Sequence, residues 1–425
     1  MRAARCVAAV IAILALASGG SPARAQPAAA AGPPPVLVGP EAVPPPPAAP
    51  PPPTAPSASS LPKEWRPSYT VGAYVEAAYT YGFERPSNGI IEQRGYDDRH
   101  NTFAIQNAVI DAQGKLGGLV ARVALQVGRT PDGYYLSEPS VRGTASAGAA
   151  SAATWRFIQQ AYAGYRFDVA NGLTVDTGVF LSPVGVERMA AKDDWNYSRS
   201  NLFFSLPHYH TGARVTLDVT ARTRVMMMIT NGYDSVIDNN GGKSVTSQIR
   251  YEIPDGLVLA LLYMGGPERS AGAPEGEPWR HLVDGHVSAK LTSWLELAAQ
   301  ADGGVERNRY GVSWFAAGAA YARIHPASWL YVAGRGDYVT ERRPVDARGA
   351  EASPMFFPAS WMTSGTATLD LRPHDHVSLR VEYRHDRASR ELYFAGEVKG
   401  DGEKTPYVPN ARSQNTVTAA AIAWF

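Results

Sequence analysis

The chain has 425 residues, of which 45% are hydrophobic, 10% are aromatic and only 19% are charged. Its 40 basic residues balance 39 acidic ones, so the composition offers no cationic excess for binding nucleic acid. The single cysteine, Cys6, excludes a disulfide framework, a thiolate zinc site and a cysteine nucleophile in the body of the chain. Beyond the N-terminus no apolar run is long enough for a membrane helix.

The N-terminus has the pattern of a secretory signal peptide. Arg2 and Arg5 flank the start of an apolar run over residues 6–17, and small residues follow as far as Ala23-Arg24-Ala25. A charged segment, a short apolar segment and an A-x-A site are the three parts of a cleavable signal. We therefore expect residues 1–25 to be removed, which leaves a nearly neutral chain without cysteine.

Residues 26–66 form a segment that is rich in proline and alanine, with proline runs at 44–47 and 50–53. Fixed φ angles and missing N–H donors keep such a segment in solvated polyproline II, so it cannot bury a core. We interpret it as a disordered periplasmic spacer, which at about 3.1 Å per residue could extend on the order of 100 Å. Whether the spacer also reaches a cell-wall or periplasmic partner is left open by its composition.

From Ser68 to the last residue, apolar and polar side chains alternate. Over residues 119–127, for example, leucine and valine alternate with Arg122, Ala124 and Gln126. A period of two predicts β-strands with one apolar and one polar face. The alternation does not decide which face is which in the segments 103–116, 157–167 and 314–324.

The predicted connections between strands alternate strictly between short and long. The long ones span 82–101, 129–154, 182–210, 231–243, 265–281, 303–313, 339–360 and 387–416. Together with seven short turns they join sixteen strands, and short turns on one rim with long loops on the other are typical of a bacterial outer-membrane barrel. We predict an all-β fold over residues 67–425, a transmembrane antiparallel up-and-down β-barrel of about 16 strands with short periplasmic turns and long external loops.

Aromatic residues gather at the ends of the predicted strands. Amphipathic rings favour the headgroup boundary of a bilayer, so this placement predicts girdles around the barrel. The residues concerned are Tyr79, Tyr81, Trp155, Phe157, Tyr165, Phe167, Tyr251, Tyr263, Trp294, Trp329, Tyr338, Trp361 and Tyr383.

The last segment has a terminal insertion signal. Alternate residues from Val417 to Ala423 form one apolar face that finishes on Phe425, with Trp424 beside it. A closing strand that ends in phenylalanine is what outer-membrane insertion machinery typically recognises. We therefore expect outer-membrane lipid and this machinery as partners, and a multi-pass location in the bacterial outer membrane after signal cleavage.

The centre of the chain carries several short motifs in a fixed order. They are Gly178-Val179-Phe180, Pro183-Val184-Gly185-Val186-Glu187, Asn196-Tyr197-Ser198-Arg199-Ser200, His208-Tyr209-His210-Thr211-Gly212-Ala213-Arg214, Thr230-Asn231-Gly232-Tyr233-Asp234, Asp238-Asn239-Asn240-Gly241-Gly242-Lys243-Ser244 and Tyr263-Met264-Gly265-Gly266-Pro267-Glu268. In these residues the chain resembles the OmpL-like family of outer-membrane β-barrel porins, most clearly over 155–270 and continuously to Phe425. The resemblance implies a barrel porin but no particular solute.

Motifs for chemistry are weak in this sequence. A Gly-x-Ser-x-Gly elbow and a phosphate-binding Gly-x-x-x-x-Gly-Lys-Ser/Thr loop are both absent, so we expect no enzyme and no catalytic residues. The pairs His208/His210 and His374/His376 could share a strand face as metal ligands, but they lack a carboxylate pair nearby, and rim histidines are the simpler interpretation. An oxygen-rich loop around Asp234 and Asp238 could hold Ca²⁺, although its spacing suits a turn as well. We therefore predict no metal and no cofactor.

The third external loop, from Ser182 to His210, is the candidate constriction. It contains six charged residues, Glu187, Arg188, Lys192, Asp193, Asp194 and Arg199. We predict that this loop enters the pore, with its carboxylates facing basic wall residues such as Arg122, Arg166 and Arg214. Opposed charges across a narrow aqueous gap would set ion preference. A solvated outer loop is the alternative.

The polar strand faces supply the predicted wall of the lumen. The charged residues on them are Glu76, Arg122, Asp176, Arg214, Asp218, Arg250, Glu252, Asp284, Lys290, Glu296, Asp302, Arg335, Asp337, Arg380, Glu382 and Arg384. Because both signs are nearly balanced, we expect weak ion selectivity.

The sequence thus predicts an outer-membrane porin for passive diffusion of small hydrophilic solutes and ions through a water-filled, weakly selective pore, since sixteen strands enclose an aqueous channel unless loops fill it. The alternative is a loop-plugged structural or adhesive barrel without channel activity. Trimers are common among sixteen-stranded porins, and nothing in the sequence argues for or against a homotrimer.

Overall fold

The computed structural model describes residues 67–135 and 155–425. The predicted signal peptide (1–25) and spacer (26–66) lie outside the described residues, as does most of the connection predicted at 129–154. None of the helices in the described ranges is both long and apolar enough to span a membrane.

The described chain forms sixteen strands and three short helical segments. The strands are β1 Ser68–Gly82, β2 Thr102–Leu116, β3 Leu119–Val127, β4 Ile158–Phe167, β5 Leu173–Leu181, β6 Tyr209–Asp218, β7 Thr223–Thr230, β8 Ser244–Ile253, β9 Leu257–Pro267, β10 Trp279–Lys290, β11 Leu295–Asn308, β12 Gly311–Ala327, β13 Leu330–Arg342, β14 Trp361–His374, β15 Val377–Ala388 and β16 Ser413–Trp424. The helical segments are α2 Arg129–Tyr134, η3 Ala191–Asp193 and η4 Phe203–Ser205.

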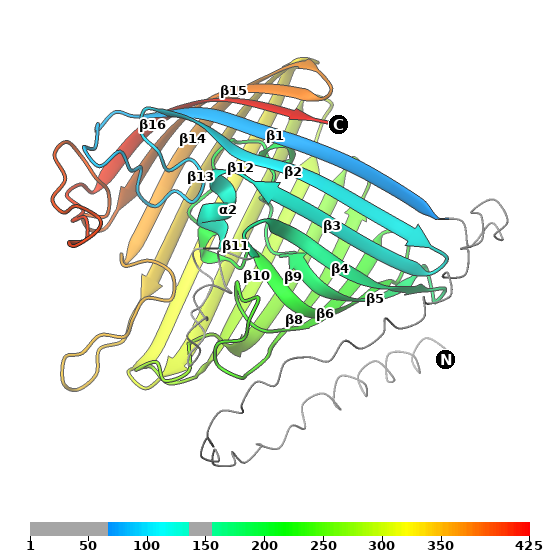
Figure 1. The fold of residues 1–425 in the computed structure, drawn as a ribbon, viewed down its shortest axis with the longest axis horizontal. Helices are drawn as coiled ribbons and strands as arrows, with labels where there is room; N and C mark the ends of the chain where they lie inside the picture. Colours follow the sequence, from blue (N-terminus) through cyan, green and yellow to red (C-terminus); the bar gives the residue numbers. More distant parts are fainter. Residues whose placement is uncertain (1–66, 136–154) are drawn as a thin grey trace, which may run out of the picture. The chain divides into compact units, whose positions relative to one another are not determined.

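Each strand pairs antiparallel with its neighbours in the sequence, and β1 pairs with β16 to close the barrel. At the seam, Ala73 and the C-terminal Phe425 exchange two backbone hydrogen bonds of 3.0 Å. The predicted all-β, antiparallel up-and-down barrel of sixteen strands is therefore confirmed. The longer connections lie at the left in Figure 1, and the short turns and the C-terminus lie at the opposite rim.

One predicted long loop is wrong. Residues 303–313 were expected to form a connection, but β11 continues to Asn308, β12 begins at Gly311, and only Arg309 and Tyr310 lie between them. The sequence misleads here because Gly303 and Gly304 have no side chains that could show an alternation, although their backbones are fully paired with β12.

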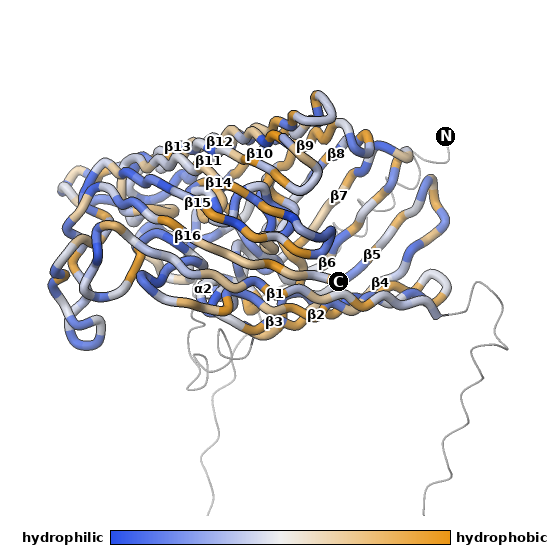
Figure 2. The backbone as a smooth tube through the Cα atoms, turned by 90° about the horizontal axis from the view of Figure 1, so that it is seen from above, coloured by the Kyte–Doolittle hydropathy of each residue, from blue (hydrophilic) through white to orange (hydrophobic). Residues whose placement is uncertain are grey.

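The two faces of the strands differ as the alternation predicts. Leu119, Val123 and Leu379 are exposed on the outside, whereas Glu76 and Arg380 are buried on the inside. Figure 2 shows hydrophobic and hydrophilic positions alternating along the strands. Many of the predicted girdle aromatics are exposed, among them Phe157, Tyr165, Phe167, Tyr263, Trp294, Trp329, Tyr338 and Tyr383, although Tyr383 lies in the middle of β15.

Two of the ambiguous segments contain β-bulges. Glu76 opposes Asn107 and Ala77 opposes Ile105, so Gln106 is an extra residue in β2. A second bulge in β4 inserts Gln159 between the partners of Ala124 and Leu125. A bulge switches the parity of every later residue, which is why no single face could be assigned over 103–116 and 157–167.

The third ambiguous segment, 314–324, turns apolar residues toward the inside of the barrel. Phe315 and Tyr321 of β12 are buried there in one cluster with inward residues of β9 and β10, such as Leu262 and Leu282. Leu202, from the connection between β5 and β6, belongs to the same cluster. The interior is therefore polar but contains apolar clusters against which this connection packs, of which this is one.

Candidate functional site

Residues 182–208, the connection between β5 and β6, lie inside the barrel; we call them the lumen loop. Backbone N–H groups of this loop donate to carboxylates on strands far away in the sequence. Ala191 donates to Glu76 Oε1 of β1 at 2.7 Å, while Tyr197 and Ser198 donate to the two Glu382 oxygens of β15 at 2.6 and 3.0 Å. Buried carboxylates of the wall thus accept from loop amides that are shielded from bulk water.

Three wall arginines bind the other polar groups of the lumen loop. Arg380 Nη1 donates to the carbonyls of Ala191 and Asn196 at 2.9 and 3.1 Å. Arg335 donates to the Glu187 carboxylate at 2.7 Å, and Arg384 donates to the carbonyl oxygen of Arg199. Arg380 and Arg384 are each only 1% exposed, so the loop fills the lumen against β13–β15.

The start of the lumen loop is fitted closely to β11. Val186 N–H donates to Gln300 Oε1 at 2.8 Å. Gly185 adopts φ +80°, and a Cβ there would lie 2.9 Å from Gln300 Nε2. The left-handed backbone favours glycine at this position, and a side chain there would also displace the Gln300 amide.

The loop is also held by its own side chains. Arg199 donates to the carbonyls of Arg188, Tyr197 and Met189 at 2.9, 2.6 and 2.5 Å, and its Nε lies 3.1 Å from Asp194 Oδ2. Asp194 Oδ1 accepts from the Arg188 N–H at 2.7 Å. Burial raises the pKa of Asp194 to about 8 even though the Arg199 guanidinium acts in the opposite direction.

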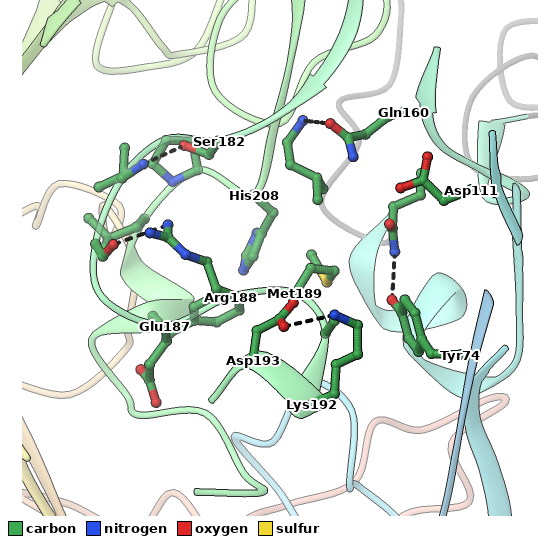
Figure 3. A pocket seen from close by; sticks show the side chains of 18 of the residues that line it. Tyr74, Asp111, Gln160, Ser182, Glu187, Arg188, Met189, Lys192, Asp193 and His208 are labelled. Carbon is green, nitrogen blue, oxygen red and sulfur yellow. Dashed lines mark hydrogen bonds and ion pairs between the residues drawn. The ribbon is translucent and has the colours of Figure 1, made fainter. Parts of the chain in front are cut away.

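A cavity of about 450 Å³ remains between the lumen loop and the opposite wall. Arg188, Lys192 and Asp193 line it from the loop, and Tyr74, Asp111, Arg122, Gln159 and Gln160 line it from β1–β4. Figure 3 shows Arg188, Lys192 and Asp193 of the loop and Tyr74, Asp111 and Gln160 of the wall around the cavity, with Lys192 bound to Asp193. A second cavity of about 200 Å³ lies on the other side of Arg188, against Trp195, Ser288 and Tyr321.

All six charged residues predicted for the constriction lie in the lumen loop, and Asp193 lines the cavity whose opposite wall carries Arg122, one of the expected arginines. Glu187 binds Arg335, and Asp194 lies next to Arg199. The expected partners bind wall aspartates instead: Arg122 binds Asp111 at 2.5 Å, Arg166 binds Asp218 at 3.1 Å and Arg214 binds Asp176 at 2.9 Å. Glu187 and Asp194 bind elsewhere because the loop crosses to β13–β15, whereas these arginines lie on β3, β4 and β6.

The predicted wall residues fall into three groups. Those buried inside the barrel are Glu76, Asp176, Asp284, Asp302, Arg335, Asp337, Arg380, Glu382 and Arg384. Those that are half-buried are Arg122, Arg214, Asp218, Arg250 and Glu296. Glu252 and Lys290 are exposed near the short-turn ends of β8 and β10.

Sequence reasoning missed several buried charges of the interior. Asp386 pairs with Arg384 and with Arg94 from the connection between β1 and β2. Glu306 accepts from both Arg269 and Arg280. Asp386 continues the alternation 380, 382, 384 and could have been found in that way, whereas Glu306 was hidden in the wrongly predicted loop at 303–313.

The histidine and aspartate groups considered as metal ligands have protein partners. Asp234 accepts from the N–H groups of His208 and Tyr209 at 2.6 and 3.2 Å. Asp238 Oδ1 accepts from Asn240 and Gly241 N–H at 2.9 Å, which makes it a turn residue. Across residues 67–135 and 155–425, no group of three or more His, Cys, Asp or Glu side chains is arranged to hold a metal ion.

A closed antiparallel barrel with an apolar outside, a charged inside and a loop folded into the lumen has the architecture of an outer-membrane porin. The family described as "Putative beta-barrel porin-2, OmpL-like" matches residues 68–425, so the chain belongs to this family. The family and the fold imply a multi-pass barrel in the outer membrane.

Solved porin structures share this fold at low sequence identity. Outer-membrane expressed OmpT of Vibrio cholerae is 10% identical with a TM-score of 0.53, covering 84% of this chain and 98% of its own. The anion-selective porin from Comamonas acidovorans is 11% identical with a TM-score of 0.53, covering 84% and 100%. Salmonella typhi OmpF in complex with daunomycin is 12% identical with a TM-score of 0.51, covering 86% and 99%. No curated protein matches the chain in sequence.

Proposed function

We propose that this chain is a passive pore for small hydrophilic solutes and ions in the outer membrane. The observation that carries the proposal is the cavity of about 450 Å³ between the lumen loop and the wall of β1–β4, whose lining includes charged and amide side chains of the loop and the wall beside apolar ones. Polar walls of this kind keep a passage hydrated, so solutes cross by diffusion without a chemical step.

Pairing of the lumen charges supports weak overall selectivity. Arg122, Arg166 and Arg214 each have an aspartate partner on the wall, and Lys192 binds Asp193 within the loop at 2.7 Å. A paired charge adds little to the field along the passage, because its partner cancels it within a few ångströms.

The lumen loop is proposed as the constriction that sets the size limit. Its contacts with Glu76, Gln300 and Glu382 attach it to three separate parts of the wall. Deletion of residues 187–199 removes the part that spans the lumen, and the single-channel conductance is expected to increase. Unchanged conductance and selectivity would exclude the loop as a constriction.

Maturation and assembly complete the proposal. Residues 1–25 are cleaved as a signal peptide, residues 26–66 act as a periplasmic spacer, and Trp424 and Phe425 direct insertion of the barrel at residues 67–425. We extend the proposal to a homotrimer, since one solved relative in fold is the trimer form of Vibrio cholerae OmpT. N-terminal sequencing of the purified protein tests the cleavage site, and native mass spectrometry in detergent tests the assembly.

A loop-plugged structural or adhesive barrel is the second candidate, and the dense packing of Arg380 and Arg384 against the lumen loop favours it. Recording from purified protein in a planar lipid bilayer separates the two. Discrete conductance steps are expected of a porin, and their absence at protein amounts that give steps with a known porin would favour the plugged barrel.

A further inference from the structure

Neighbouring residues of the lumen loop point in opposite directions. Glu187 binds Ser200 N–H and Arg335 on the side of β13, whereas Arg188 faces the cavity (Figure 3). The loop therefore presents the Arg188 guanidinium to the cavity, beside Glu187 and Asp193, which also line it.

Arg188 differs from the other charged residues of the loop because its guanidinium has no carboxylate partner among the described residues. Lys192 binds Asp193 at 2.7 Å and Arg199 lies 3.1 Å from Asp194. The side chain of Arg188 makes one long hydrogen bond, from Nη1 to the Gly185 carbonyl at 3.4 Å. Most of the five donors of its guanidinium are thus available to a ligand.

Charged groups of both signs and an apolar surface surround Arg188. Burial and the like charge of Arg250 lower the pKa of Arg188, while the charges of Asp194, Asp193 and Asp284 act in the opposite direction. These three carboxylates are engaged elsewhere: Asp193 with Lys192, Asp194 with Arg199 and Asp284 with His286. The same cavity is also lined by Val184, Leu202 and Leu206 of the lumen loop.

We propose that Arg188 is a binding site for the carboxylate group of small organic anions passing through the pore, with their apolar part against Val184, Leu202 and Leu206. The planar guanidinium fork matches a carboxylate in a bidentate geometry that Lys cannot form. Arg188 lines both the cavity of about 450 Å³ and the one of about 200 Å³, so an anion bound there stands in the passage. The inference rests on the proposed function and adds a solute class to it.

The test compares Arg188→Gln with Arg166→Gln in bilayer recordings. Both variants remove one positive charge, but Arg166 is paired with Asp218, which keeps Arg224 as a partner at 2.7 Å. Benzoate, added during chloride conduction, is the probe. The benzoate concentration that blocks the chloride current should be equal in the wild type and in Arg166→Gln. In Arg188→Gln the same block should require about tenfold more benzoate, because at least one charge-assisted hydrogen bond to the carboxylate is lost.

A third variant, Arg188→Lys, separates charge from geometry. It should keep the chloride-to-potassium preference in the reversal potential but lose most of the benzoate block. Equal block in the wild type and Arg188→Gln, or an equal loss in Arg166→Gln, would overturn the carboxylate site and leave the porin intact. Absence of channels in the wild type would overturn the proposed function and this inference together. Heat-dependent migration of each variant on a gel verifies that its barrel has folded.

Discussion

Glu382 is the wall residue whose removal should release the lumen loop with the least damage to the barrel. Its carboxylate accepts from Tyr197 N–H at 2.6 Å, from Ser198 N–H at 3.0 Å and from Thr368 Oγ1 at 2.7 Å. In Glu382→Ala both loop amides lose their acceptor inside the barrel. Each buried donor left without a partner costs about 1–3 kcal/mol, so docking should weaken by at least about 2 kcal/mol, or roughly 30-fold in the docked-to-released ratio.

Limited proteolysis with trypsin measures this release, because Arg188, Lys192 and Arg199 are cleavage sites within the lumen loop. Cleavage between 188 and 199 should be slow in the wild type and at least tenfold faster in Glu382→Ala. Asp176→Ala is the control, since it removes another buried wall carboxylate whose partner, Arg214, lies on β6. If Glu382→Ala and the wild type are cleaved at the same rate in folded barrels, the loop is not held as we describe.

Three further variants test separate parts of the account. Gly185→Val places a side chain against Gln300 at a φ of +80°, which should loosen the start of the lumen loop from β11. The mean conductance and its noise in bilayer recordings should therefore rise. Gly349→Val, which is also at positive φ but has nothing near its Cβ, should change neither. Burial raises the pKa of Asp194 to about 8 in the docked loop, whereas a released loop would have an ordinary carboxyl pKa of about 4. Docking should therefore be strongest below about pH 4, where both states are protonated. It should weaken as the pH rises to about 8, because the released state loses its proton first, and then level off. Conductance should follow this curve in the wild type and be flat in Asp194→Asn, and a pH dependence that survives the substitution would contradict the assignment. Deletion of Phe425, whose backbone closes the seam with Ala73, should reduce the amount of folded barrel in outer-membrane fractions several-fold, and undiminished levels would argue against a terminal insertion signal.

The barrel could be predicted because the period of two depends only on local sequence and one face contacts lipid. Leu119 and Val123 are exposed where the alternation placed them outside. The failures have local physical causes: the extra residues Gln106 and Gln159 shift the parity, and Gly303 gives no sign of its face.

The site could be predicted only in outline. The position of the third long connection indicated the lumen loop, and all six of its charged residues were found. Their partners could not be found, because contacts such as Glu187 with Arg335 or Tyr197 with Glu382 join residues 148 and 185 positions apart. The opposite directions of Glu187 and Arg188 are likewise fixed by packing against β13, which no periodicity of the sequence encodes.

The most direct test of the central claim, that the lumen loop narrows a water-filled passage, is the size limit for uncharged solutes. Swelling of liposomes that contain the purified protein measures it with sugars of increasing size. We predict that the wild type admits monosaccharides and excludes larger oligosaccharides, and that deletion of residues 187–199 admits those as well. An identical size limit for both proteins, or no swelling with either, would contradict the account.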